Sequence, residues 1–417
     1  MKKHHDEYAK SRTSHLDPAI FCDHGPRGLI LSETGTLVGK RLAVKDVFQL
    51  KGEKNTAGSP EWFRTHDGAK ETAFSLFQLL KAGAEFIGFT HLDELAYSMQ
   101  GSNMHYGAAD NPKLPGYFCG GSSMGSAAAV ASGAADIALG TDTGGSVRVP
   151  ASYCGLFGIR TSHSLVPRQG VIGLAPCFDT VGWFAQTASL LGDVGKVLLP
   201  PSCLPIKRSM RLVICDEINQ LADVNIQQAM AEYLPKLQGH FDSVERVSLS
   251  DSLILSQLAD VFRILQGRGI AKEHGNWLKR HRPILSDDVA ARVAMALSIT
   301  DEEVAWARRK QQDWSQQMAA WLPSNDTVLL LPTSATTALK KDARLSKEAL
   351  IGLRQRLLGL TAIAGLWGAP QCHVPAFSIR GSSGEKNIKV NKPSGFSLLM
   401  APNNDAALLA LVEDIMA

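Results

Sequence analysis

Two glycine- and serine-rich segments hold the residues whose types and spacing could do chemistry. The first covers residues 119–126 (CGGSSMGS) and the second covers residues 140–148 (GTDTGGSVR). Glycine permits positive φ angles, so such loops can direct several backbone N–H groups at one point. That arrangement binds a phosphate, or it stabilises the oxyanion formed during acyl transfer. A third explanation is that the glycines form tight turns in a packed core.

The phosphate explanation lacks its sequence pattern. Neither G-x-x-x-x-G-K-[ST] nor G-x-G-x-x-G occurs at these loops, and no lysine follows the glycine cluster. Three hydroxyl side chains, those of Ser122, Ser123 and Ser146, lie inside the loops, where backbone donors would surround them. Their positions favour acyl transfer.

Lys45 is a candidate general base. It interrupts the apolar segment 39–48 (GKRLAVKDVF), which reads as a strand. Burial lowers the pKa of a lysine, and a neutral lysine can activate a serine. The alternative is a surface lysine beside Asp46 whose stem alone is buried.

The surrounding elements predict an α/β fold with crossover connections. Residues 84–90 read as a buried strand, and residues 70–83 show helical spacing that ends at glycine. Residues 126–140 predict a helix of small residues followed by a strand. Residues 205–330 carry mainly helical periodicity, and residues 326–332 return to a strand pattern.

Composition excludes several classes of protein. The 417 residues carry a net charge of +3. This excess of positive charge is too small to predict a basic surface that binds nucleic acid. Seven cysteines without a CxxC pair argue against a disulfide scaffold or zinc ribbon and favour a reducing, cytoplasmic location. Without an apolar run of about 18 residues or a secretory h-region, we expect no membrane span and no signal peptide.

Residues 120–160 resemble the signature of the amidase signature family of Ser–cisSer–Lys hydrolases. Residues 43–48 (AVKDVF) are similar to that family's lysine motif, and residues 179–185, 362–370 and 394–402 match later family elements. The resemblance implies one large α/β domain over residues 1–417, with a mixed, mostly parallel central β-sheet covered by helices. Its parts would be an N-terminal arm (1–30), the core motifs (40–190), a helical substrate-side region (205–330) and closing strands and helices (331–417).

The resemblance also implies roles for individual residues. Ser146 would be the acylating nucleophile, Ser122 the serine after a cis peptide bond, and Lys45 the base. The oxyanion hole would use the N–H groups of Thr143, Gly144, Gly145 and Ser146. Supporting residues would be Ser123, Asp142 and Arg148, and the substrate pocket would include Tyr97, Ser98, Met99, Gln100 and Met124. This chemistry needs no metal and no organic cofactor.

The implied function is hydrolysis of a small carboxamide to a carboxylate and ammonia or an amine. Within the family, residues 59–66 and 91–112 look closest to plant indole-3-acetamide hydrolases, which favours an aryl-acetamide. The alternatives are a hydrolase of a urea-derived acid such as allophanate, the A subunit of a tRNA-dependent amidotransferase, and a non-catalytic interaction module. We expect a small-molecule partner, a possible homodimer, no nucleic acid and no membrane. His105 and His163 are interpreted as ordinary polar residues, because no G-x-S-x-G elbow accompanies them.

Overall fold

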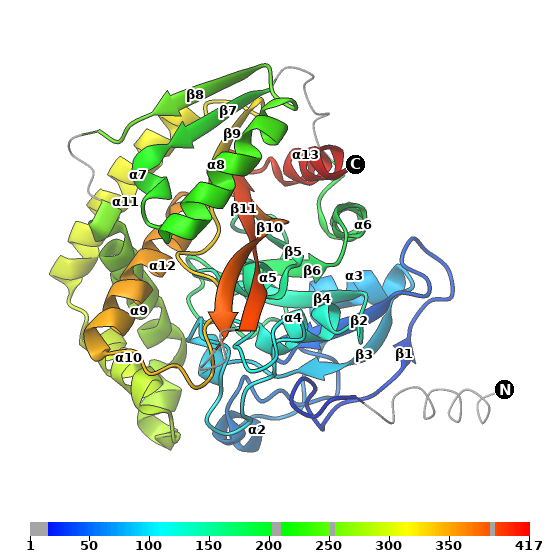
Figure 1. The fold of residues 1–417 in the computed structure, drawn as a ribbon. Coiled ribbons are helices and arrows are strands. Elements are labelled where there is room, and N and C mark those ends of the chain that lie inside the picture. Colours follow the sequence, from blue (N-terminus) through cyan, green and yellow to red (C-terminus); the bar gives the residue numbers. More distant parts are fainter. Residues whose placement is uncertain (1–15, 202–209, 251–254, 384–387) are drawn as a thin grey trace.

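A mixed sheet of eleven strands runs through the molecule. The computed structural model describes residues 16–201, 210–250, 255–383 and 388–417. The strand order across the sheet is β1-β3-β2-β4-β6-β5-β10-β11-β9-β7-β8 (Figure 1). In chain order the strands are β1 (Leu29–Ile30), β2 (Arg41–Lys45), β3 (Glu85–Thr90), β4 (Ile137–Asp142), β5 (Phe157–Arg160), β6 (Thr180–Ala185), β7 (Arg211–Cys215), β8 (Ser243–Val247), β9 (Thr327–Pro332), β10 (Gln371–Ser383) and β11 (Ile388–Leu399).

The single large α/β domain is confirmed, but the sheet is not mostly parallel. Strand β2 pairs in parallel with β3 and β4, and β7 pairs in parallel with β8 and β9. The other neighbouring pairs in the described sheet are antiparallel. The cause is the long β10–β11 hairpin and the reversed strand β6, which together join two small parallel groups at the sheet's two sides.

Helices cover both sides of this sheet. They are α2 (Pro60–Thr65), α3 (Phe74–Lys81), the 3₁₀ turn η1 (Glu94–Ala96), α4 (Met124–Ala131), α5 (Arg148–Cys154), α6 (Ala188–Leu198), α7 (Asp216–Asn219), α8 (Val224–Gln238), α9 (Leu255–His281), α10 (Asp287–Ser298), α11 (Asp301–Trp321), α12 (Lys347–Trp367) and α13 (Asp405–Met416). Figure 1 shows α9, α10, α11 and α12 grouped on one side, away from β2, β3 and β4. The expected helices and the strands at residues 39–48 and 84–90 are present.

The region 205–330 is less purely helical than expected. The strand expected at residues 326–332 is present as β9, and the region also supplies β7 and β8 to the same side of the sheet. Strand β7 is a five-residue apolar run too short for its period to be read, and β8 is an exposed outer strand without an alternating pattern. Residues 202–209 and 251–254 of this region, and residues 1–15 of the expected arm, lie outside the described residues.

The remainder of the N-terminal segment joins the sheet. Strand β1 pairs with β3 at the sheet's edge, and Phe21 forms an isolated bridge to Thr90. Ile20, Phe21 and Cys22 are buried. Residues 16–30 therefore form a short element at the sheet's edge, which is one of the two forms expected for the N-terminal segment.

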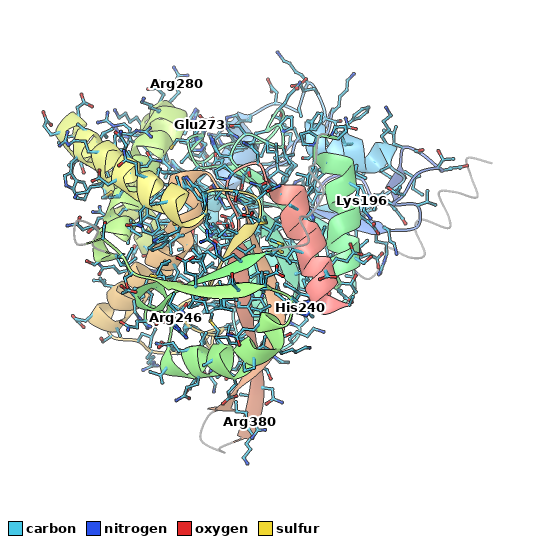
Figure 2. The ribbon with its side chains drawn as sticks, turned by 90° about the horizontal axis from the view of Figure 1, so that it is seen from above. Lys196, His240, Arg246, Glu273, Arg280 and Arg380 are labelled. Carbon is cyan, nitrogen blue, oxygen red and sulfur yellow. The ribbon has the colours of Figure 1, made fainter. Side chains whose placement is uncertain are left out.

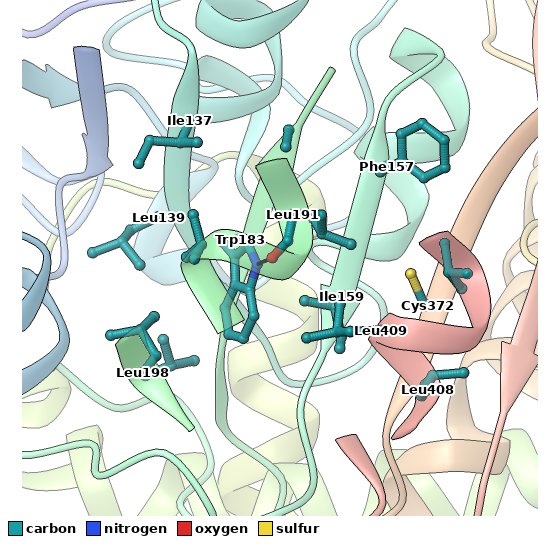
Figure 3. Close-up of a cluster of buried hydrophobic side chains, with 14 of the residues drawn as sticks. Ile137, Leu139, Phe157, Ile159, Trp183, Leu191, Leu198, Cys372, Leu408 and Leu409 are labelled. Atoms are coloured by element: carbon teal, nitrogen blue, oxygen red, sulfur yellow. Dashed lines mark hydrogen bonds between the residues drawn. The ribbon is translucent and has the colours of Figure 1, made fainter. Parts of the chain in front are cut away.

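Trp183 lies at the centre of the main hydrophobic core (Figure 3). Its ring lies among Leu139 of β4, Ile159 of β5 and Leu198 of α6, as Figure 3 shows. The indole N–H donates a hydrogen bond of 3.0 Å to the Leu191 carbonyl, so the ring's one polar group is satisfied inside the core. This contact fixes α6 against β4, β5 and β6.

Charged side chains are spread over the outside of the molecule. Figure 2 shows Lys196 on α6, Arg246 on β8, Arg280 on α9 and Arg380 on β10, far apart from one another.

Helix α12 is the one helix of the described chain that is long and apolar enough to cross a membrane by length and composition alone. The expectation of no such segment rested on counting uninterrupted apolar residues, and the charged residues near the start of this helix interrupt that count. Half of the segment Glu348–Trp367 is buried, and the helix contacts α9 and α11. A core helix of a globular domain meets the same criterion.

Candidate active site

The parallel pairing of β2 and β4 places Lys45 beside Thr141. Val44 of β2 lies opposite Leu139 of β4, so both strands end at the same edge of the sheet. Lys45, the last residue of β2, donates a hydrogen bond of 2.8 Å from its Nζ to the Thr141 Oγ1. The side chain that interrupts the apolar strand is therefore turned toward the glycine-rich loop that follows β4.

The first glycine-rich loop approaches Lys45 from the N-terminus of α4. Lys45 Nζ donates a second hydrogen bond, also 2.8 Å, to the Ser122 Oγ. The Gly121–Ser122 peptide bond is cis. A side chain at Gly125 would lie 2.7 Å from the carbonyls of His91 and Ile20, so only glycine lets α4 approach the sheet this closely. That approach brings Ser122 to the end of β2.

Burial makes Lys45 a base that is available near neutral pH. The side chain is 0% exposed, and burial lowers the pKa of the Lys45 amine to about 7. The carboxylates of Asp93, Asp142 and Asp179 act in the opposite direction and keep that pKa from falling further. Near pH 7 a large share of the amine is therefore neutral and can accept a proton.

Asp142 holds the second glycine-rich loop in place. Its carboxylate accepts hydrogen bonds from the Gly145 and Val147 N–H groups at 2.9 and 3.1 Å. It also forms buried ion pairs with Arg148 and Arg160 at 2.8 and 3.2 Å. Burial alone would raise the pKa of Asp142, but the two guanidinium groups hold it below the usual range. Asp142 and Arg148 thus position the loop, as the sequence predicts for supporting residues.

Position 145 requires glycine for two reasons, its backbone conformation and the close approach of Thr361. Its φ is +119°, and a Cβ there would lie 2.7 Å from the Thr361 Cγ2 on α12. The Gly145 N–H is already bonded to Asp142, which corrects its predicted place in the oxyanion hole. Among the described residues, the N–H groups of Gly144 and Ser146 have no hydrogen-bond acceptor.

Ser146 lines a cavity of about 560 Å³. Its hydroxyl has no hydrogen-bond partner within the described part of the chain. Its carbonyl accepts a 3.3 Å hydrogen bond from the Ser123 N–H, so the two glycine-rich loops lie in contact. Catalytic hydrogen bonds often tighten only when substrate is bound, so the free hydroxyl is compatible with a nucleophile.

Four predicted pocket residues line the same cavity as Ser146. They are Tyr97, Ser98, Met99 and Gln100. Met124 does not line it, because the Met124 side chain points into a separate apolar cluster under α4 and is 0% exposed. The prediction that Met124 shapes the substrate pocket is wrong, since the first residue of α4 faces the sheet.

The remaining sequence candidates take structural positions. The Ser123 hydroxyl donates to the Thr141 carbonyl at 3.4 Å rather than to Lys45 or Ser146. The His105 ring is hydrogen-bonded to the Ile284 carbonyl, and the His163 ring is hydrogen-bonded to the Pro176 carbonyl. Neither histidine is hydrogen-bonded to Ser122 or Ser146.

Sequence reasoning missed three groups that shape this site. Thr141 bonds Lys45, Arg160 pairs with Asp142, and Asp93 lies against Gly121, where a Cβ would be 2.4 Å from the Asp93 Oδ1. Asp93 is buried three residues after β3 ends, and a carboxylate at that position is a signal that could have been used. Arg160 carries no such signal, because it ends an ordinary-looking strand.

The cavity's far wall comes from helices that the motifs did not indicate. Arg263 on α9, Met295 on α10 and Leu357 on α12 line it opposite the loops. Most of its lining surface is apolar, with phenyl and thioether groups such as those of Phe118 and Met99. Five cationic side chains also line it, those of Arg263, Arg292, Lys340, Arg344 and Arg354. A cavity with a mainly apolar lining is typical of small-molecule sites.

Comparison with known proteins defines the class. A sequence profile of the family described as Amidase matches residues 28–199. Amidase 1 of Arabidopsis thaliana is 34% identical over 93% of this chain and 94% of its own length. The chain therefore belongs to the amidase family, and it is an amide hydrolase.

Two further similarities mark the breadth of that family. Translocon at the outer membrane of chloroplasts 64, from Pisum sativum, is 33% identical over 80% of this chain and 60% of its own length. The crystal structure of an amidase superposes with a TM-score of 0.81 at 24% identity, covering 98% of this chain and 94% of that chain. The second similarity concerns the fold alone.

Proposed function

We propose that Ser146 is the acylating nucleophile of this amide hydrolase and that Lys45 and Ser122 form its proton relay. The observation that carries the proposal is the buried hydrogen bond of 2.8 Å between Lys45 Nζ and Ser122 Oγ, with the pKa of the amine at about 7. A neutral amine bonded to a hydroxyl can draw the hydroxyl's proton. Ser146 supplies a second hydroxyl at the edge of the cavity.

The proposed reaction has two stages. Lys45 accepts the Ser122 proton while Ser122 accepts the Ser146 proton, and the Ser146 Oγ bonds to the amide carbon. The C–N bond then breaks as Ser122 gives a proton to the leaving nitrogen, which departs as ammonia or an amine, and Lys45 returns its proton to Ser122. Water next attacks the Ser146 ester through the same relay, releasing a carboxylic acid and restoring the hydroxyl.

The proposed oxyanion hole uses backbone donors of the second glycine-rich loop. Gly144 and Ser146 line the cavity, and their N–H groups have no acceptor in the described part of the chain. Thr143 is the third donor, and its side chain is held by a 2.6 Å hydrogen bond to Asp179. Because Asp142 and Asp179 fix this loop before substrate binds, its N–H groups need little reorganisation during the reaction.

The proposed substrate is an aryl-acetamide such as indole-3-acetamide. A cavity of about 560 Å³ with a mainly apolar lining accommodates an aromatic body beside Ser146. Phe118, Tyr153 and Met99 offer surfaces on which such a ring can pack. Allophanate is small and polar throughout, so it would leave most of this lining unoccupied.

A turnover assay tests the proposed nucleophile and the proposed substrate together. Ammonia release is measured with indole-3-acetamide, phenylacetamide, acetamide and allophanate for the wild type, Ser146→Ala and the control Ser132→Ala, whose residue lies at the end of α4. We expect aryl-acetamide turnover in the wild type and the control and none in Ser146→Ala. Turnover unaffected by Ser146→Ala contradicts the nucleophile, whereas preference for allophanate contradicts the substrate.

We also propose a reducing, cytoplasmic location and a homodimer. The described cysteines are all free thiols, and most are buried. Cys119 and Cys154 are close enough for the Cys154 thiol to reach the Cys119 carbonyl at 3.6 Å, yet they form no disulfide. Fractionation of the native cells tests the location, and light scattering of the purified chain tests the dimer.

A further inference from the structure

A second cluster of chemically active side chains lies beside the proposed relay without taking part in it. Asp46 follows Lys45 at the end of β2, and His91 follows β3. Cys22 and His24 come from the segment before β1. Thiol, imidazole and carboxylate groups are the side chains that bind transition metals.

The backbone holds these residues in fixed relative positions. The Cys22 N–H donates to the Phe89 carbonyl at 2.9 Å, and the His91 N–H donates to the Ile20 carbonyl at 2.9 Å. The Asp46 N–H donates to the Thr90 carbonyl at 3.2 Å. Because three neighbouring chain segments are joined by backbone hydrogen bonds, the cluster's geometry does not depend on flexible side chains alone.

The distances between the potential ligand atoms match the edges of a tetrahedral site. With metal–ligand bonds of about 2.0–2.3 Å, tetrahedral geometry separates ligand atoms by about 3.3–3.8 Å. Here the Cys22 Sγ lies 3.5 Å from the His91 Nδ1 and 3.8 Å from the Asp46 Oδ2. The His24 Nε2 lies 3.2 Å from the Asp46 Oδ1. The ligand atoms of Cys22, His24 and Asp46 all lie within 4.8 Å of one another.

Further groups orient the side chains as outer partners orient metal ligands. Asp46 also accepts hydrogen bonds from Asn55 Nδ2 and from the Thr56 N–H, both at 2.8 Å. The His24 Nδ1 lies 3.8 Å from the exposed Asp23 carboxylate. The His91 ring hydrogen-bonds the backbone at Pro18, where the carbonyl is the acceptor because proline has no N–H.

Hydrogen bonds within the protein explain why the Asp46 carboxylate is buried here, but they do not explain why the Cys22 thiol lies beside it. Asn55 and Thr56 already satisfy the buried carboxylate, so Asp46 gains little from a thiol at 3.8 Å, which is a weak donor. The Cys22 side chain is 1% exposed and lies where the carboxylate and the His91 imidazole converge. A thiolate in that position is a ligand of the soft-to-borderline kind that selects zinc over magnesium or calcium.

We propose that Cys22, His24 and Asp46 bind one divalent ion of the zinc class. On binding, the Cys22 thiol loses its proton to solvent, and His24 coordinates as a neutral ring. The ion would tie the segment before β1 to the ends of β2 and β3. Its role is structural, because the acyl transfer proposed at Ser146 needs no metal.

The test uses the full chain, stripped with a chelator and titrated with Zn²⁺ against a competing chromophoric chelator. We expect one equivalent to bind to the wild type. Cys22→Ser and His24→Gln should each raise the Zn²⁺ dissociation constant at least about 100-fold, the upper end of the effect of losing an outer partner. The controls Cys177→Ser and His163→Gln remove the same residue types outside the cluster and should bind as the wild type does.

Cobalt provides a readout that does not depend on the variants folding. Co²⁺ added to the stripped wild type should give a near-ultraviolet sulfur-to-metal charge-transfer band, which Zn²⁺ then removes. Absence of that band, with no stoichiometric Zn²⁺ binding, overturns the proposal. Equal Zn²⁺ affinity of the wild type and a folded Cys22→Ser variant overturns it as well. Neither outcome depends on amide hydrolysis.

Discussion

The pH dependence of hydrolysis tests the role of Lys45 most directly. Because burial places the pKa of the Lys45 amine at about 7, the active neutral form is about half populated at pH 7 and about 1% populated at pH 5. kcat/KM should therefore fall about 50-fold between those two pH values, with a slope of one in the logarithmic plot. The sign is fixed, since lowering the pH protonates the base and removes activity.

The Asp93→Asn variant makes this prediction specific to Lys45. Asp93 is the first of the three carboxylates that raise the pKa of Lys45 against the effect of burial, so removing its charge should move the acid limb to lower pH. The matched control is Asp193→Asn, whose exposed carboxylate pairs with Lys196 on α6. The assay is initial-rate ammonia release from pH 4.5 to 9 under kcat/KM conditions. An acid limb that stays in place in Asp93→Asn, in a folded protein, refutes the assignment of the limb to Lys45.

Three further predictions concern the nucleophile, the loop and the cavity. A fluorophosphonate probe should label the wild type at Ser146 by peptide mass spectrometry, and labelling of Ser122 instead would reverse the proposed order of the serines. Arg148→Met leaves the buried Asp142 with one cation, so the free energy of unfolding should fall by about 3–5 kcal/mol in urea denaturation, and a change under 1 kcal/mol would contradict the ion pair's structural role. Met99→Trp should fill part of the cavity and raise KM for indole-3-acetamide more than for acetamide, and equal effects on both amides would place the ring elsewhere.

The sequence was most informative where chemistry restricts residue type. Lys45 inside an apolar strand and serines between glycines indicated a shared site, and in the structure Lys45 contacts Ser122 directly. Those inferences succeed because a buried amine and a glycine-rich turn each have few structural explanations. The α/β class followed from alternating strand and helix periods for the same reason.

The errors have physical causes as well. The resemblance to the family's motif placed Met124 in the pocket, but the side chain of this first residue of α4 is buried in the core. The antiparallel strand pairs arise from the direction in which β6, β10 and β11 enter the sheet. Local periodicity in the sequence does not predict the direction of a strand. The use of the Gly145 N–H by Asp142 is likewise a three-dimensional fact, invisible in the order of residues.

The anchoring of Arg148 has a consequence for the order of events during synthesis. Its guanidinium donates to the Thr361 carbonyl and the Gln371 side chain at 3.0 and 2.6 Å, across 213 and 223 residues of chain. The ribosome must therefore have synthesised the chain past Gln371 before Arg148, which follows the loop carrying Ser146, can form both hydrogen bonds. Contacts between such distant residues form late and slowly, so a nascent or prematurely terminated chain carries the serines and the lysine without a working arrangement of them.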